Sequence, residues 1–337
     1  MMNHGLRKFL GAIRGVLLPG GVAIGCAAAL LGMPLTAQAA AKSGGLFGQS
    51  RPAGTGGVTT ISGAAGGGLV PWALIAGYGG AGQIGFTASY THASTANFNA
   101  NGYGVAAGID NRVEVSITQQ NFDLGNTGPY LATALGAQSL SAVGQPLQDN
   151  AAINQDIIGL KVRVFGNALA QGTWMPQVAV GAQYHHNEDG ALMKDLGASA
   201  SGGSYYLALT KVWLKGLLGH VTLLDFTLDA TRANYNGLFG FGGPTDNRYH
   251  YEPEVSAGVF LDPHVMVGGE YRAMPQNELL VGNPAGPMVS QSNAWKDVFM
   301  AYIPNKNVSL TLAYAMLGHI AGIPNSNGLY TSVTASF

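Results

Sequence analysis

Two histidines and two carboxylates in one short stretch are the residues best suited to bind a metal. The segment "YHHNEDG" spans residues 184–190 and holds His185, His186, Glu188 and Asp189. Imidazole and carboxylate groups are common ligands of transition metals. Neighbouring residues of a strand point to opposite faces, so only one of the two histidines could join a given site. The segment is better explained as the exposed base of a loop, and we predict no metal and no cofactor.

A hydrolytic site would need a serine beside a histidine, and the sequence gives no sign of such a pair. No serine lies in a Gly-x-Ser-x-Gly or another recognisable nucleophile context. Further histidines are scattered along the chain, at His220, His250, His264 and His319. We therefore predict no catalytic residue and no enzyme activity. A lipid-modifying outer-membrane enzyme is the least favoured alternative.

A glycine-rich stretch, "GLFGFGGPTDN" at residues 237–247, has the glycine content of a phosphate-binding loop. It lacks the Lys-Ser/Thr ending of such loops and does not open a helix. A glycine-rich extracellular loop that folds inward as a constriction is the better interpretation.

Charged residues are few, and those in the alternating segments gather on one face. They make up 10% of the 337 residues, against about 25% in a typical soluble domain. The charges expected to face the inside of a barrel are Lys161, Arg163, Asp225, Asp229, Glu252, Glu254, Glu270 and Arg272. Opposed acidic and basic walls could set a transverse field for polar solutes. The same charges could instead form a closed network that plugs and braces the lumen, and the pattern favours neither.

The elements that must position these residues are segments of about ten residues in which apolar and polar positions alternate. In "RYHYEPEVSAGVFL", Val255 and Val259 share one face, whereas Glu252 and Glu254 share the other. Segments of this length suit a tilted membrane strand. The core of a soluble β-sandwich could not hold unpaired charges. We therefore predict an all-β fold, an antiparallel transmembrane β-barrel.

This face assignment makes a prediction about two substitutions. Val259→Arg is expected to lower the stability of the barrel by about 2–4 kcal/mol if the site is near the midplane, and Glu254→Arg is expected to be tolerated.

Fourteen strands are predicted, with 12 as the alternative. The spans are 57–64, 71–79, 82–92, 101–109, 112–122, 154–165, 173–185, 204–214, 220–232, 248–261, 265–273, 294–303, 308–317 and 328–337. The first two mix glycines with a proline, and the barrel has 12 strands if they lie inside the lumen. Tight connections at 110–112, 262–264 and 304–307 alternate with longer ones. This asymmetry predicts short periplasmic turns and longer extracellular loops.

The N-terminal 41 residues have the three parts of a secretory signal peptide. Basic residues come first, an apolar stretch follows, and small residues precede a cleavage point after Ala39 or Ala41. The one cysteine, Cys26, lies in the apolar stretch. We predict a removed signal at 1–41, a flexible periplasmic lead-in at 42–55 and the barrel at 56–337.

The final segment, "LYTSVTASF", places Leu329, Val333 and Phe337 on one face of a strand. It resembles the C-terminal assembly signal of bacterial outer-membrane barrels, which ends in an aromatic residue. The resemblance implies recognition by the barrel-assembly machinery. In such a barrel the last strand must pair with the first, because lipid cannot satisfy an open edge.

Four segments resemble one proteobacterial outer-membrane family that carries only a domain-of-unknown-function label. They are "GAAGGGLVPWALIAGYG", "GLKVRVFG", "LFGFGG" and "PNKNVSLTLAYAMLGHIAG". The resemblance covers about residues 56–337 and implies the outer membrane of a Gram-negative bacterium, with no established substrate. We expect a porin-like channel for passive passage of a small solute, in contact with outer-membrane lipid and not with nucleic acid. A non-conducting structural or interaction barrel is the alternative.

Overall fold

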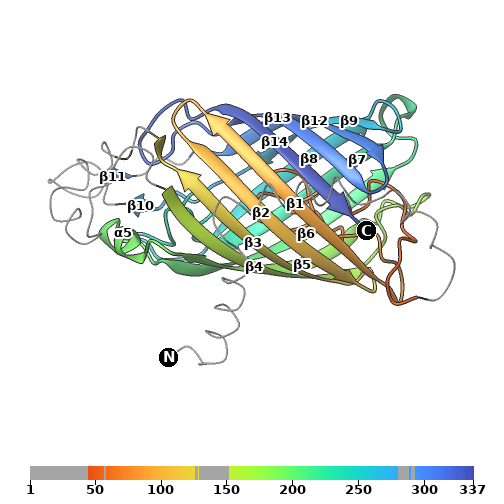
Figure 1. Ribbon diagram of the computed structural model, residues 1–337, viewed down its shortest axis with the longest axis horizontal. Coiled ribbons are helices and arrows are strands. Elements are labelled where there is room, and N and C mark those ends of the chain that lie inside the picture. Colours follow the sequence, from red (N-terminus) through yellow and green to blue (C-terminus); the bar gives the residue numbers. More distant parts are fainter. Residues whose placement is uncertain (1–44, 57, 126–127, 129–151, 280–287, 290–292) are drawn as a thin grey trace, which may run out of the picture. The chain divides into compact units, whose positions relative to one another are not determined.

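Twelve antiparallel strands close into a barrel in this computed structural model (Figure 1). The structure describes residues 45–56, 58–125, 128, 152–279, 288–289 and 293–337. The barrel strands are β1 (Ile84–Thr95), β2 (Asn99–Ile109), β3 (Val113–Asp123), β4 (Ala152–Phe165), β5 (Gln177–Asn187), β6 (Ser201–Trp213), β7 (Thr222–Thr231), β8 (His250–Phe260), β9 (Val265–Arg272), β12 (Trp295–Asn305), β13 (Val308–Met316) and β14 (Gly328–Ser336). Each pairs with its neighbours, and β1 closes the barrel by pairing with both β2 and β14.

In the described part of the chain, few other elements accompany the barrel. A short helix, α5 (Gly190–Asp195), and a 3₁₀ turn, η3 (Leu217–Gly219), lie in connections, and β10 (Glu278–Leu279) pairs with β11 (Met288–Val289). Among the described residues, no helix has the length and apolarity that a membrane-spanning helix needs. The predicted signal peptide, residues 1–41, lies outside the described residues.

The strand predictions are confirmed for the 12-strand alternative. Twelve of the fourteen predicted spans overlap observed strands, whereas 57–64 and 71–79 contain none. Glycines and Pro71 make these two spans poor ladder formers, because glycine adds little packing and proline cannot donate a ladder hydrogen bond. They lie inside the barrel instead, as described below.

Apolar and polar positions alternate between the two faces of the barrel, as predicted. Outward-pointing Val115, Leu160 and Leu312 are 41%, 50% and 46% exposed, whereas inward-pointing Glu114 and Lys161 are each 1% exposed. A slip of one residue would exchange the two faces, so this pattern specifies the register of every strand. The outer surface is therefore the apolar one.

The two ends of the barrel differ in their connections. The short-turn end contains the tight turns after β2, β8 and β12. Across them Ile109 pairs with Val113, the amide of Leu261 donates to the Val265 carbonyl at 2.8 Å, and Asn305 pairs with Val308. Asp110 and Asn111 have φ values of 57° and 45°, a conformation that Asp and Asn tolerate. The longer connections and α5 lie at the opposite end, here called the long-loop end (Figure 1).

Candidate functional site

An internal segment of the chain fills the barrel lumen. This plug segment comprises residues 58–80, and all of them except Val58 and Ile61 are buried. It carries no charge, since the sequence contains no Asp, Glu, Lys or Arg from residue 52 to residue 109. Short bridges between Thr59 and Ala65 and between Gly66 and Pro71, with further internal hydrogen bonds such as that from the Ile61 amide to the Gly68 carbonyl, order part of its backbone. The remaining buried backbone groups need partners on the barrel wall.

One ion pair on the wall binds the plug segment at two places. Glu114 on β3 lies opposite Lys161 on β4, and Lys161 Nζ is 3.2 Å from the carboxylate. The Glu114 carboxylate accepts from the amides of Ala65 at 3.0 Å and Ala76 at 2.8 Å. Lys161 Nζ donates to the carbonyls of Ala65 and Leu74 at 2.8 and 2.9 Å. The two charges thus pair with each other and with backbone groups of Ala65, Leu74 and Ala76 in the plug segment.

A second group of charges lies on β7, β8 and β9, around one guanidinium. Arg272 Nε is 2.8 Å from Glu254 Oε1, and Arg272 Nη2 is 3.4 Å from Asp229 Oδ2. Arg272 Nη1 also donates to the Leu69 carbonyl at 3.3 Å. Next to it, Glu270 Oε2 accepts from the Leu69 amide at 2.6 Å. This group therefore binds the turn of the plug segment at residue 69 through both of its backbone groups.

Neutral side chains complete the binding of the plug segment. Thr210 Oγ1 accepts from the Ala73 amide at 2.7 Å, and Gln177 Nε2 donates to the Ala73 carbonyl at 2.7 Å. Thr227 Oγ1 donates to the Pro71 carbonyl at 2.9 Å. These partners come from β5, β6 and β7, so anchors surround the segment on several sides.

The residues just before the plug segment hold its short-turn end. The Arg51 guanidinium donates to the carbonyls of Thr55, Ile75 and Gly77. Burial lowers the pKa of Arg51 to about 10, so it stays charged at neutral pH. The Phe337 oxygen accepts from the amides of Tyr78 and Phe86, both at 2.9 Å. The plug segment is thereby tied to the strand pair that closes the barrel.

A second segment enters the lumen from the long-loop end. The inward loop, residues 233–242 after β7, is buried throughout, in keeping with the constriction expected from its glycines. Asn236 Nδ2 donates to Ser62 Oγ of the plug segment at 2.9 Å, and the Asn236 carbonyl accepts from Gln155 at 3.1 Å. His185 packs against Phe241 of this loop with ring centroids 5.5 Å apart. The two internal segments therefore meet inside the barrel.

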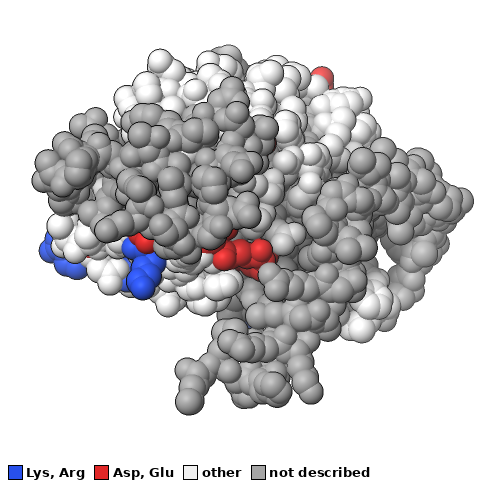
Figure 2. Space-filling model, turned by 60° about the vertical axis from the view of Figure 1, so that its left-hand side comes forward, with Lys and Arg blue, Asp and Glu red and all other residues white. Residues whose placement is uncertain are grey.

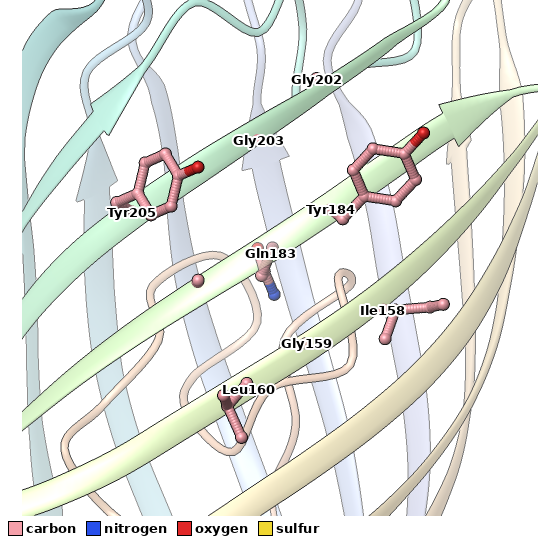
Figure 3. Close-up of a pocket in the computed structure, with 9 residues that line it drawn as sticks. Ile158, Gly159, Leu160, Gln183, Tyr184, Gly202, Gly203 and Tyr205 are labelled. Atoms are coloured by element: carbon pink, nitrogen blue, oxygen red, sulfur yellow. The ribbon is translucent and has the colours of Figure 1, made fainter. Parts of the chain in front are cut away.

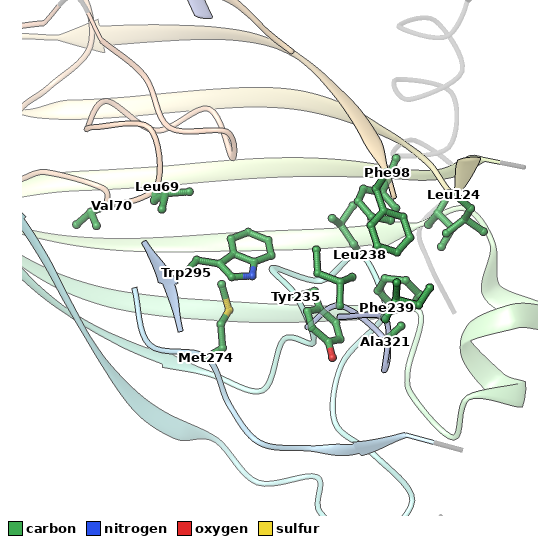
Figure 4. Close-up of a cluster of buried hydrophobic side chains, with 14 of the residues drawn as sticks. Leu69, Val70, Phe98, Leu124, Tyr235, Leu238, Phe239, Met274, Trp295 and Ala321 are labelled. Atoms are coloured by element: carbon green, nitrogen blue, oxygen red, sulfur yellow. The ribbon is translucent and has the colours of Figure 1, made fainter. Parts of the chain in front are cut away.

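Apolar side chains surround this meeting point toward the long-loop end (Figure 4). Phe122 contacts Phe98 and Phe239, with ring centroids 5.0 and 6.0 Å apart. Tyr235, Leu238, Met274 and Trp295 belong to the same buried cluster. Water is therefore displaced from this part of the lumen by side chains as well as by main chain.

The structure separates the charges that the sequence placed in the lumen. Lys161, Asp225, Asp229, Glu254, Glu270 and Arg272 are buried, whereas Arg163 and Glu252 are half-buried. Lys161 pairs with Glu114, and Arg272 pairs with Asp229 and Glu254. Lys161, Glu270 and Arg272 also bond the plug backbone. Sequence analysis missed Glu114 and Arg51. Glu114 stands on the polar face of its strand, but only the β3–β4 register shows that it meets Lys161.

Gly63, at the tip of the plug segment, allows a direct test of how the segment packs against the barrel wall. Gly63 has φ +86°, and a Cβ there would lie 1.8 Å from Thr118 Oγ1 on β3. Gly63→Ala is therefore expected to unseat the tip and to speed proteolysis of the segment. Gly82→Ala is the matched control, because Gly82 has φ +70° but open space around its Cβ position. Both variants incur the roughly 1–2 kcal/mol of backbone strain, so equal proteolysis rates would contradict this seating.

Charge at the described surface is sparse. Figure 2, which turns the side of the long-loop end forward, shows small separate acidic and basic groups among uncharged residues. Exposed Arg248 and half-buried Asp246 form one ion pair, 3.0 Å apart. Within the described ranges, no group of three or more His, Cys, Asp or Glu side chains is arranged to hold a metal. His185 and His186 point to opposite faces, as expected for neighbours in a strand.

Comparison with known proteins gives a family and several barrels of similar fold. The family model described as "Protein of unknown function (DUF3034)" matches residues 55–334. The KdgM porin shares 7% identity, covering 74% of this chain and 98% of its own, with a TM-score of 0.41. The COG4313 outer membrane channel from Pseudomonas putida F1 shares 12% identity over 80% and 97%, with a TM-score of 0.41. Outer membrane phospholipase A from Escherichia coli shares 12% over 78% and 93%, with a TM-score of 0.36. No curated protein sequence matches the chain.

Proposed function

The chain belongs to the DUF3034 family, and from its geometry we propose an outer-membrane β-barrel channel that its own plug segment closes at rest. The closed ladder and the apolar outer surface support a place in a membrane, because lipid cannot satisfy an open edge or a polar face. Exposed Trp174, Tyr184, Tyr205 and Tyr251 supply the aromatic residues that interfaces favour.

The observation that carries this proposal is the binding of plug backbone by wall charges. Glu114, Lys161 and Glu270 all bond plug amides or carbonyls. Hydrogen bonds to charged groups contribute about 1.5–3 kcal/mol each. Several of them together keep the open state rare. Passage of a small polar solute then requires the plug segment to leave the wall, and water to take its place beside the charges.

A reversible crosslink tests whether the plug segment controls conduction. Ala73 and Thr210 are joined by a 2.7 Å hydrogen bond, so the pair Ala73→Cys and Thr210→Cys should form a disulfide. We expect rare stepwise openings of the unmodified protein in planar bilayers, none of the oxidised double variant, and recovery on reduction. Each single-cysteine variant is the control, because its conductance should be the same before and after reduction. Equal conductance before and after reduction would show that the path does not involve the plug segment.

A non-conducting barrel is the second candidate, favoured by the apolar cluster of Figure 4. It predicts no conductance in planar bilayers for the unmodified protein or for the reduced crosslink variant, although the barrel is folded in both. Resistance to unfolding in detergent until boiling would establish that folded state.

A further inference from the structure

Four polar side chains form a row across the outward face of the barrel near the long-loop end. Gln119 of β3 lies opposite Asp156 of β4, Asp156 lies opposite His186 of β5, and His186 lies opposite Ser201 of β6. His186 Nδ1 is 2.7 Å from Ser201 Oγ. At the far side of the row, Gln119 Nε2 donates to Asp156 Oδ1 at 3.4 Å.

The order within the row is that of a nucleophile, a base and a group that orients the base. β4 and β6 pair with opposite edges of β5, so Asp156 and Ser201 lie on opposite sides of His186 in the sheet. Directly opposed residues of a sheet have Cβ atoms about 4.5–5.5 Å apart. A serine within hydrogen-bond reach of a histidine, with the histidine oriented by a third group, is the arrangement of an activated nucleophile. His186 is exposed and Ser201 half-exposed, so a substrate can reach them.

A lipid-facing groove begins directly beside this row. It has a volume of about 430 Å³ and runs over β4, β5 and β6. Its floor contains Gly159, Gly202 and Gly203, and its outward walls are apolar or aromatic. Those walls are Ile158, Leu160, Tyr184 and Tyr205 (Figure 3). On an outer surface that faces hydrocarbon, a groove of this kind fits an acyl chain.

The register places the groove and the polar row in contact. Ile158, Tyr184 and Gly203 form the next outward row, two residues along each strand from Asp156, His186 and Ser201. Two strand residues span about 6.6 Å. An acyl chain in the groove would therefore bring its ester group to Ser201, and the two tyrosines mark the level where a lipid headgroup meets hydrocarbon.

We propose that Ser201, His186 and Asp156 form an exterior hydrolase site for the ester bond of a membrane lipid. Ser201 Oγ attacks the ester carbonyl carbon while His186 accepts the hydroxyl proton. The carbon–oxygen bond to the lipid alcohol breaks, His186 returns the proton to that alcohol, and the acyl group stays on Ser201. A water molecule, deprotonated by His186, then attacks the acyl-serine, releasing a fatty acid and restoring Ser201. Asp156 is a positioning residue that orients the imidazole.

This activity goes beyond the proposed channel and does not depend on it. The row and groove lie on the outer face, whereas the plug segment binds inside. Loss of conduction would leave the hydrolase proposal standing, and the reverse is equally true.

A covalent serine probe tests the site without assuming the natural substrate. A fluorophosphonate should label the folded, unmodified protein at Ser201, and Ser201→Ala should abolish labelling. His186→Ala should slow labelling by about 100- to 10,000-fold, the usual contribution of a general base. Ser94→Ala is the matched control, because Ser94 is another strand serine whose Oγ bonds Asn99 at 2.8 Å and no histidine. Absence of labelling, or labelling that survives Ser201→Ala, would overturn the proposal.

The groove has its own test with phospholipid in mixed micelles. The unmodified protein should release fatty acid, and Ser201→Ala should not. Ala182→Trp should fill the groove and suppress release from long-chain phospholipid while fluorophosphonate labelling persists. Asp156→Asn should slow both reactions, because the imidazole loses the group that orients it, and Asp156→Glu should restore part of the rate. Labelling without any release of fatty acid would overturn the assignment of a lipid substrate.

Discussion

Deleting residues 58–80 is expected to raise the conductance of a mostly silent barrel, with the inward loop, residues 233–242, left as the remaining constriction. The 12 strands make their ladder contacts without this segment. Water entering the emptied lumen would solvate Glu114, Lys161 and Glu270, so none of these charges would be left buried and unpaired. The measurement is conductance in planar bilayers, compared with that of the unmodified protein.

The same deletion should also lower the free energy of unfolding by several kcal/mol. Each lost plug–wall hydrogen bond contributes about 0.5–1.5 kcal/mol when neutral and more when charged. A synthetic peptide of residues 58–80 should restore the block, whereas a scrambled peptide should not. A folded deletion variant that stays silent would contradict the channel and leave the non-conducting barrel.

Val255→Arg is expected to destabilise the barrel by about 2–4 kcal/mol, the cost of arginine near the bilayer midplane. Val255 is 37% exposed on the outer face and pairs with Phe226 and Tyr271. Val259 lies on the same face but close to the turn at 262–264. Val259→Arg should therefore cost only about 0–1 kcal/mol, as near an interface, less than the sequence-based expectation. Equal losses for the two variants in lipid unfolding experiments would contradict this depth assignment.

Glu254→Arg was expected from sequence to be tolerated, and the structure argues against that expectation. Glu254 is fully buried, and its carboxylate is 2.8 Å from Arg272 Nε. Replacement would place two guanidiniums together without their carboxylate. Breaking a buried pair costs about 3–5 kcal/mol, so this variant should unfold more easily than Val259→Arg.

The alternation of apolar and polar residues was enough to predict the strands and their faces. Period-two patterning fixes which side chains point outward, and odd-length turns such as 110–112 fix the register across a hairpin. The structure of the two glycine-rich spans at 57–64 and 71–79 was harder to predict. Many of their partners are wall side chains far away in the sequence, such as Glu114 for Ala76, and no local pattern encodes such a pairing.

The row of polar side chains on the outer face also depends on pairing that the sequence does not reveal. Sequence reasoning treated His186 as the base of a loop and found no serine beside a histidine. Ser201 stands 15 residues later, across a connection that contains α5, and only the β5–β6 register brings it next to His186. A sequence motif can reveal a nucleophilic serine when one turn contains the whole motif. Here Asp156, His186 and Ser201 lie on three separate strands.

The contact between Ser62 and Asn236 links the two mouths of the barrel mechanically. The plug segment is anchored at the short-turn end, and the inward loop hangs from the long-loop end. Suppose that a ligand binds the inward loop from outside and changes the stability of this contact. By thermodynamic reciprocity, the affinity of that ligand must then change when the contact opens. A ligand bound to the inward loop would thus change how firmly the plug segment is held.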